Sequence, residues 1–323
     1  TSGLTGAVQR IRAARPFRSE GVVVRAIGLA LESDGPACEV GEECVVVGAN
    51  GSLLSRAQVV GFSGSRIFTM PVDRLLGVAV GARVIALGRR PVIPVCESLL
   101  GRVLDADGLP IDGRPADPAD DWYPIEAPAP PPMARERISL MFGTGVRAID
   151  ALTTIGRGQR VGIFAGSGVG KSCLLGMVAR HARADVAVVA LVGERGREVK
   201  DFLEDDLGPL GLKHAVVFVA TSDEPPLRRV RAALAATSAA EYFRDRGRNV
   251  VLLMDSITRV AMAQREIGLS MGEPPSSKGY PPSVFSLLPR LVERAGPVAG
   301  GGSITGIYSV YVEGDDLNDP IAD

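Results

Sequence analysis

The sequence predicts two successive domains, a small antiparallel β-barrel followed by an α/β domain with a mostly parallel sheet. Three observations predict this arrangement. Short β-rich runs separated by turn residues fill residues 21–88, apolar runs alternate with helical spacing beyond residue 150, and a glycine-rich turn occupies residues 164–172. A chain of 323 residues, 46% of them hydrophobic, is long enough for two domains.

Composition narrows the classes of protein. The formal net charge is −1, so no overall positive field would hold nucleic acid or an anionic membrane, and we expect no nucleic-acid partner. Four cysteines without C-x-x-C spacing and two histidines argue against a zinc site and a disulfide framework. No apolar run reaches about 18 residues, and no signal peptide is evident, so we expect a cytoplasmic protein.

The N-terminal part is expected to comprise an arm at residues 1–18 and a barrel domain at residues 19–90. The arm carries four arginines, and we favour a solvated terminus over a basic partner-binding arm. The barrel is predicted from short apolar runs 8 to 15 residues apart, with turn signals such as Asn50-Gly51 between them. These runs lie at residues 22–27, 44–47, 58–62, 66–70 and 83–87.

The remaining residues, 91–323, are expected to form the α/β domain. Residues 105–137 contain Asp-Gly turns and a proline-rich run, which favour a spacer along the surface over a recognition ligand for an aromatic groove. Runs at residues 186–192, 215–220 and 250–254 are almost wholly apolar, as in parallel strands buried on both faces. The segments between these runs, notably residues 227–246, have amphipathic helix spacing, so strands and helices alternate as in an α/β core. In such a core a ligand is expected at the carboxyl ends of the strands.

The glycine-rich turn predicts a phosphate-binding loop, or P-loop. It fits G-x-x-x-x-G-K-[ST] in the relaxed form that accepts Ala165 at the first position, and an apolar strand and a helical pattern flank it. Backbone N–H groups and the helix dipole would bind the phosphates of ATP or GTP. Lys171 would reach the β- and γ-phosphates, and the Ser172 hydroxyl would bind Mg²⁺. The expected nucleotide-binding residues are Gly166, Ser167, Gly168, Val169, Gly170, Lys171, Ser172 and Cys173.

Two acidic residues follow predicted strands and would complete a hydrolase. Asp255 directly follows the apolar run 250–254, the position of an acid that holds Mg²⁺ through water. Glu194 follows the run 186–192, where a carboxylate can polarise the water that attacks the γ-phosphate. A strand-end aspartate and a surface glutamate without catalytic roles are the simpler alternatives.

Three segments carry a family resemblance. Residues 192–199, residues 254–266 and residues 273–285 resemble the type III protein-export ATPases, relatives of the catalytic subunit of rotary ATP synthases that serve the bacterial flagellum and the injectisome. The resemblance covers almost the whole chain from about residue 21. Its most discriminating part is Lys-Gly-Tyr-Pro-Pro-Ser-Val-Phe at residues 278–285. It implies a RecA-like P-loop core that binds ATP and Mg²⁺.

The same resemblance implies roles and partners. Glu194 matches the catalytic glutamate, Arg195 the arginine beside it, and Arg259 an arginine that approaches the γ-phosphate. The family forms homohexamers at the cytoplasmic face of the inner membrane. Its partners are stalk and stator-like proteins, the export gate and chaperone–substrate complexes, and it meets the membrane only through them.

The resemblance also places several family features beyond Asp323, namely the adenine-stacking aromatic residue, the trans arginine finger and the C-terminal helical domain. The chain starts at Thr1 without a methionine, so we interpret it as a fragment. We therefore expect weak, concentration-insensitive hydrolysis from it, because a trans arginine is worth about 10³ to 10⁵ in rate in comparable sites.

Three alternatives stay open. An injectisome ATPase shares these motifs, although we favour the flagellar version. A ring helicase on the same core would need stacking aromatics in the barrel, where residues 21–88 offer only Phe62 and Phe68. A nucleotide-binding assembly module without catalysis would not require Glu194.

Overall fold

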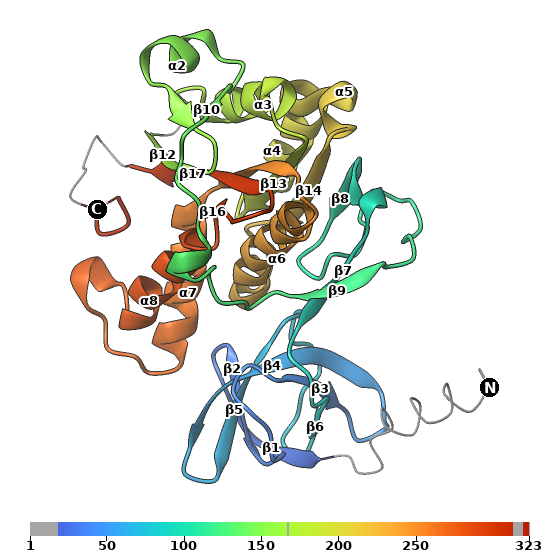
Figure 1. Ribbon diagram of the computed structural model, residues 1–323. Helices are drawn as coiled ribbons and strands as arrows, with labels where there is room; N and C mark the ends of the chain where they lie inside the picture. Colours follow the sequence, from blue (N-terminus) through green and yellow to red (C-terminus); the bar gives the residue numbers. More distant parts are fainter. Residues whose placement is uncertain (1–18, 167, 313–318, 323) are drawn as a thin grey trace. The chain divides into compact units, whose positions relative to one another are not determined.

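The structure of the chain is a computed structural model that describes residues 19–166, 168–312 and 319–322 (Figure 1). The chain divides into two compact units, Thr1–Arg90 and Pro91–Asp323. The expected arm at residues 1–18 lies outside the described residues. Within the described parts, each unit has a hydrophobic core of its own.

The first unit is a closed six-stranded antiparallel barrel, which confirms the predicted fold of this region. The strands follow one another around the barrel in the order β1-β2-β5-β4-β3-β6. Inward-facing apolar side chains such as Leu31, Val46 and Val59 fill it. The strands are β1 (Glu20–Ile27), β2 (Ala30–Asp34), β3 (Glu43–Val47), β4 (Leu53–Ser63), β5 (Arg66–Pro71) and β6 (Arg83–Ala86).

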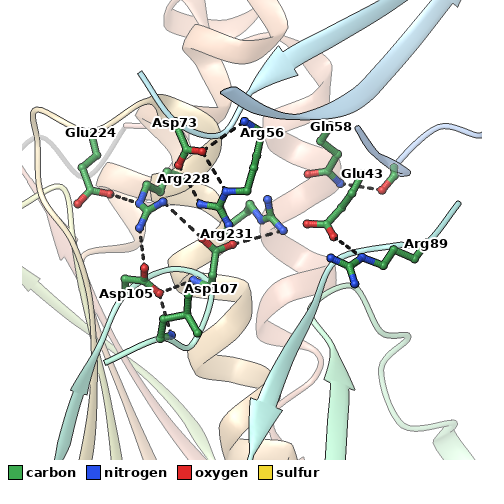
Figure 2. Close-up of polar contacts among 12 residues, drawn as sticks. Glu43, Arg56, Gln58, Asp73, Arg89, Asp105, Asp107, Glu224, Arg228 and Arg231 are labelled. Carbon is green, nitrogen blue, oxygen red and sulfur yellow. Dashed lines mark hydrogen bonds and ion pairs between the residues drawn. The ribbon is translucent and has the colours of Figure 1, made fainter. Parts of the chain in front are cut away.

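Polar contacts also hold the barrel strands. Arg56 on β4 donates from Nε and Nη2 to the two carboxylate oxygens of Asp73, over 2.9 and 2.8 Å (Figure 2). The Gln58 side chain donates to the Gly41 carbonyl over 3.1 Å. A bidentate arginine–carboxylate pair fixes orientation as well as adding energy, so the chain beyond β5 is tied back to β4.

The second unit contains a mostly parallel sheet, as predicted. Its main strands lie in the order β12-β17-β15-β13-β14-β8, and all neighbouring pairs along this path are parallel. The central strands β13, β14 and β15 are buried almost throughout and are rich in Val and Leu, because helices cover both faces of the sheet. The strands are β8 (Arg102–Leu104), β12 (Arg160–Ala165), β13 (Val186–Val192), β14 (Ala215–Ala220), β15 (Asn249–Asp255) and β17 (Ser303–Tyr311), with β16 (Gly296–Pro297) antiparallel beside β17.

Helices cover the two faces of this sheet (Figure 1). The odd-numbered residues of β13 and β15 pack with α3 and η3, whereas α6 packs on the opposite face. The α-helices are α2 (Arg147–Leu152), α3 (Lys171–His181), α4 (Gly196–Asp201), α5 (Gly208–Leu212), α6 (Pro226–Asp245), α7 (Ile257–Ser270) and α8 (Pro282–Val292). The short helical turns are η1 (Glu97–Leu99), η2 (Pro132–Ala134), η3 (Phe202–Leu207), which is π-helical, and η4 (Ser277–Gly279).

The segment expected to be a loop-like spacer is partly ordered structure. Strand β9 (Asp121–Pro124) pairs with β7 (Val92–Val95), and the short strands β10 (Met141–Phe142) and β11 (Ile155–Gly156) pair further along. Arg228 on α6 binds Asp105 over 2.7 Å and Asp107 over 3.4 Å (Figure 2). These ion pairs fasten the start of the segment to α6, which sequence pattern alone does not reveal.

A buried arginine ties α6 to the chain that follows β9. Arg294 is 2% exposed and donates to both carboxylate oxygens of Glu241, to Ser238 and to the carbonyl of Ile125. A buried charge needs this degree of pairing because an unpaired one costs several kcal/mol. The contact therefore supports the face of the sheet opposite α3.

Candidate active site

The glycine-rich turn connects the end of β12 to the first residue of α3, the strand-turn-helix context that the motif requires. Gly168 and Gly170 have φ values of +77° and +91°, a left-handed conformation in which side chains other than glycine are strained. Lys171 begins α3, an 11-residue helix whose N-terminus favours anions. Ser167, an expected binding residue, lies outside the described residues.

Lys171 and Asp255 come together although 84 residues separate them. Lys171 Nζ lies 2.6 Å from Asp255 Oδ1. Asp255 ends β15 and is 2% exposed, so Lys171 partly compensates the cost of burying its charge. Strand β17 lies between β12 and β15 in the sheet, and the lysine crosses this gap from the start of α3.

A cavity of about 410 Å³ surrounds these two residues. It brings together almost all of the predicted site, including Gly166, Ser172, Cys173 and Glu194. Val169 is not among its lining residues, and the residue is 68% exposed. The full lining is Gly166, Gly168, Gly170, Lys171, Ser172, Cys173, Leu191, Glu194, Arg195, Glu198, Val199, Phe202, Asp255, Ser256, Arg259 and Tyr311.

Glu194 follows β13 and enters the cavity from a fixed backbone. Its carbonyl accepts a hydrogen bond from the Ser222 N–H over 3.0 Å, and the Gly193 N–H donates to Ala220 over 2.7 Å. Burial, the negative charge of Asp255 and a hydrogen bond to Glu198 raise the pKa of Glu194 to about 7. The same hydrogen bond lowers the pKa of Glu198, so the proton of this pair resides on Glu194.

The two expected arginines line the cavity from different parts of the chain. Arg195 precedes α4, where its N–H donates to Glu198 Oε2 over 3.2 Å and its guanidinium lies 3.3 Å from Glu198 Oε1. Arg259 lies on α7, and its aliphatic stem packs against Gly193. A Cβ atom added at Gly193 would lie 2.8 Å from the Cβ of Arg259, closer than real contacts allow. Both arginines are exposed at the cavity wall.

Several site residues were not predicted from the sequence. Glu198 was part of a recognised motif but was given no role of its own. Ser309 and Tyr311, two residues apart on β17, were not predicted. Ser309 donates to Asp255 over 2.7 Å, and the Tyr311 N–H donates to Thr258 Oγ1 over 2.8 Å. The available signal was the presence of hydroxyl residues in this buried strand, where Ser303 and Thr305 are buried as well as Ser309, because buried polar groups need partners.

The donors present fit a magnesium ion that accompanies a nucleotide. Ser172 and Asp255 line the same cavity and offer a hydroxyl and a carboxylate, the hard oxygen ligands that Mg²⁺ takes. Among the described residues, no group of three or more His, Cys, Asp or Glu side chains could hold a metal ion. Few protein ligands are expected where phosphates and water complete the coordination.

Within residues 19–166, 168–312 and 319–322, no helix has the length and apolar character needed to cross a membrane.

Cys173, at the cavity wall, is a free thiol whose pKa is raised by a hydrogen bond to Asp206 and by the charge of that residue. A raised pKa keeps the thiol protonated and weakly nucleophilic near neutral pH.

Comparisons with known proteins show which family the chain is similar to. Residues 145–323 match the nucleotide-binding domain of the ATP synthase alpha/beta family, and residues 23–88 match the beta-barrel domain of that family. The chain is 54% identical over 307 residues to the flagellum-specific ATP synthase of Pseudomonas aeruginosa, covering 94% of this chain and 68% of the relative. It is 52% identical over 306 residues to the type 3 secretion system ATPase of Xanthomonas euvesicatoria, covering 95% and 69%.

A solved structure shows the same fold. The assembled ATPase EscN of the type III secretion system of enteropathogenic E. coli aligns with a TM-score of 0.86 and 44% identity, over 94% of this chain and 72% of that chain. The barrel, the parallel sheet and the resemblance found in the sequence are thereby confirmed. The chain belongs to the ATP synthase alpha/beta family, in the group of the flagellum-specific ATP synthases and the type III secretion ATPases.

Proposed function

We propose that this chain binds Mg²⁺–ATP and hydrolyses it to power protein export by a bacterial type III apparatus. The observation that carries the proposal is the convergence of Lys171, Asp255 and Glu194 on one cavity. A phosphate-binding lysine, a metal-binding acid and a carboxylate near neutral pKa are the groups that hydrolysis of a phosphoanhydride requires.

The loop and Lys171 bind the phosphates. Backbone N–H groups between Gly166 and Lys171, with the N-terminus of α3, supply hydrogen bonds and a positive potential. Lys171 has three N–H donors and can divide them between Asp255 and the phosphate oxygens. Bound Mg²⁺, held by Ser172 and Asp255, would neutralise the charge that develops on the phosphates.

Glu194 acts as the base that orients and polarises the attacking water. Its pKa near 7 is close to the working pH, where a general base is most effective. When Glu194 is ionised it accepts a hydrogen bond from that water, and Glu198 stabilises the protonated form that follows. Arg195 and Arg259 place positive charge around the reacting phosphate and so favour the transition state.

The relatives suggest the cellular setting. EscN has been solved in assembled form and in complex with its central stalk EscO, so we propose a homohexamer that works with a stalk protein. We further propose stator-like partners, the export gate and chaperone–substrate complexes as ligands, and a location at the cytoplasmic face of the inner membrane reached through these partners. A flagellar role is favoured by the 54% identity to the P. aeruginosa flagellar protein, and an injectisome role is the second candidate.

Nucleotide binding and hydrolysis test the biochemical part of the proposal. We expect the purified chain to bind ATP and to hydrolyse it in a Mg²⁺-dependent reaction, and we expect Lys171→Ala to weaken both. Lys213→Ala is the matched control, because this lysine follows α5 and is not among the cavity residues. Equal ATP binding by the wild type and Lys171→Ala would refute the assignment of the site.

The cellular part needs a genetic test. The gene of the full-length protein should restore swimming to a flagellar mutant of the source bacterium that lacks this ATPase. The Glu194→Gln form should be made to the same level without restoring it. Restoration of injectisome secretion but not of swimming would favour the second candidate.

A further inference from the structure

Ser309 occupies a central place in the sheet. It lies on β17, the strand between the P-loop strand β12 and the Asp255 strand β15. The parallel register pairs Met254 with Tyr308, which places Ser309 next to Asp255 on the same face. On the other side the register pairs Ser309 with Ile163, two residues before the end of β12.

The Ser309 hydroxyl makes a single directed contact with the proposed catalytic machinery. It is fully buried and donates a hydrogen bond of 2.7 Å to Asp255 Oδ1. Lys171 Nζ lies 2.6 Å from the same oxygen. Asp255 is therefore held by a donor on a long lysine side chain and by a donor on a short serine side chain of a central strand.

We infer that Ser309 is a positioning residue that holds the Asp255 carboxylate in place for the divalent cation of the bound nucleotide. The inference rests on the proposed function. Lys171 must share its donors with phosphate oxygens, so its interaction with Asp255 changes when nucleotide binds. Ser309 is fixed on the central strand β17 and keeps its hydrogen bond to Asp255 when nucleotide binds.

A purely structural role for Ser309 predicts something different. A buried serine that only fills space or pairs within the strand would affect the stability of the fold and not the dependence on metal. A hydrogen bond from a second residue to a metal ligand fixes the orientation of that ligand, and its loss typically weakens metal binding about 10- to 100-fold. The dependence on Mg²⁺ therefore separates the two roles.

The test measures equilibrium binding of a fluorescent ADP analogue as MgCl₂ is added, using the wild type, Ser309→Ala, Ser309→Thr and Ser309→Cys. We expect Ser309→Ala to raise the Mg²⁺ concentration for half-maximal enhancement of binding about tenfold. Affinity in EDTA should stay within about twofold of the wild type, which also reports an intact P-loop. Ser309→Thr keeps the hydroxyl and should restore the wild-type midpoint.

Ser309→Cys keeps the branching of the side chain, with a larger sulfur atom that donates weakly, so its midpoint should lie between those of the wild type and Ser309→Ala. If Ser309→Ala does not fold, the Mg²⁺ midpoint of Ser309→Cys is compared with that of the wild type instead. Ser303→Ala is the matched control: Ser303 is a buried serine on the same strand whose hydroxyl contacts Asn249, far from the site along β17. It should leave the midpoint unchanged.

An unchanged midpoint in both Ser309→Ala and Ser309→Cys would overturn the inference, as would an equal shift in Ser303→Ala. These results leave the proposed function intact, because the wild type would still bind nucleotide. Failure of the wild type to bind the analogue at any Mg²⁺ concentration would instead overturn the proposed function, and the inference with it.

Discussion

Glu194 connects the geometry of the cavity to a measurable pH dependence. Burial, the charge of Asp255 and the hydrogen bond to Glu198 raise its pKa from an ordinary value of 4.5 to about 7. As a general base Glu194 must be ionised, so the rate of hydrolysis is expected to fall as the pH drops below this pKa. The perturbation that isolates the effect is Glu194→Gln, which keeps the shape and removes the charge.

The size of the effect follows from the titration. With a pKa of about 7, roughly nine-tenths of Glu194 is ionised at pH 8 and roughly one-tenth at pH 6, so the rate should change about tenfold across this interval. An unperturbed glutamate would be ionised at both pH values, and the profile would be flat. Loss of the base should lower kcat by about 10²- to 10⁴-fold.

The assay is release of phosphate between pH 6 and pH 8 at Mg²⁺–ATP concentrations well below KM, where the rate follows kcat/KM and therefore the titration of the nucleotide-free enzyme. We expect the wild type to show the tenfold rise, and Glu194→Gln to be slow and independent of pH. Glu204→Gln is the control, because Glu204 is a glutamate of η3 whose side chain is 65% exposed and outside the cavity lining. A flat wild-type profile, or a Glu194→Gln variant with more than about a tenth of the wild-type rate, would refute this role.

Three further predictions concern stability. The folded protein binds the Glu194 proton more tightly than the unfolded chain, because the pKa is raised from 4.5 to about 7. The free energy of unfolding therefore falls as the pH rises from 4.5 to about 7, and the ionised carboxylate destabilises the fold above pH 7. In urea at pH 8, the free energy of unfolding of Glu194→Gln should exceed that of the wild type by on the order of 1 kcal/mol, after allowance for solvent screening. A less stable variant would contradict the raised pKa. Gly193→Ala should cost about 2 kcal/mol, because its φ of +73° and the stem of Arg259 both oppose a methyl group; an unchanged midpoint in urea would show that the backbone relaxes. Arg294→Met should cost about 3 to 5 kcal/mol because it leaves Glu241 buried without its main partner, and adding Glu241→Met should recover part of that loss.

The fold was largely predictable because burial leaves a plain trace in the sequence. Strands β13 and β14 have the bounds that their apolar runs predict, residues 186–192 and 215–220. Strand β2 was missed because Ala30–Asp34 is short and mostly polar, and it is defined by pairing with β1 and β5. Strand β9 was hidden in a proline-rich segment for the same reason, since pairing with β7 is a long-range contact.

Some residues of the candidate site could also be predicted from the sequence, and others could not. Lys171 and Asp255 could be placed because each follows a recognisable strand, and carboxyl ends of parallel strands meet at one edge of a sheet. The proton shared by Glu194 and Glu198 depends on side-chain distance and burial, which no local pattern records. Ser309 required knowledge of strand order, because β17 is the last strand that the structure describes along the sequence but lies inside the sheet.

That strand order has a consequence for the synthesis of the protein. The ribosome completes the P-loop and the acid at the end of β15 well before it reaches Ser303–Tyr311, yet β12 can join β15 only through β17. During translation the lysine and the aspartate therefore have no common framework until residue 311 has left the exit tunnel. We therefore expect nucleotide affinity to arise only after β17 has joined the sheet, so that immobilised nucleotide should capture only nascent chains whose central sheet is complete.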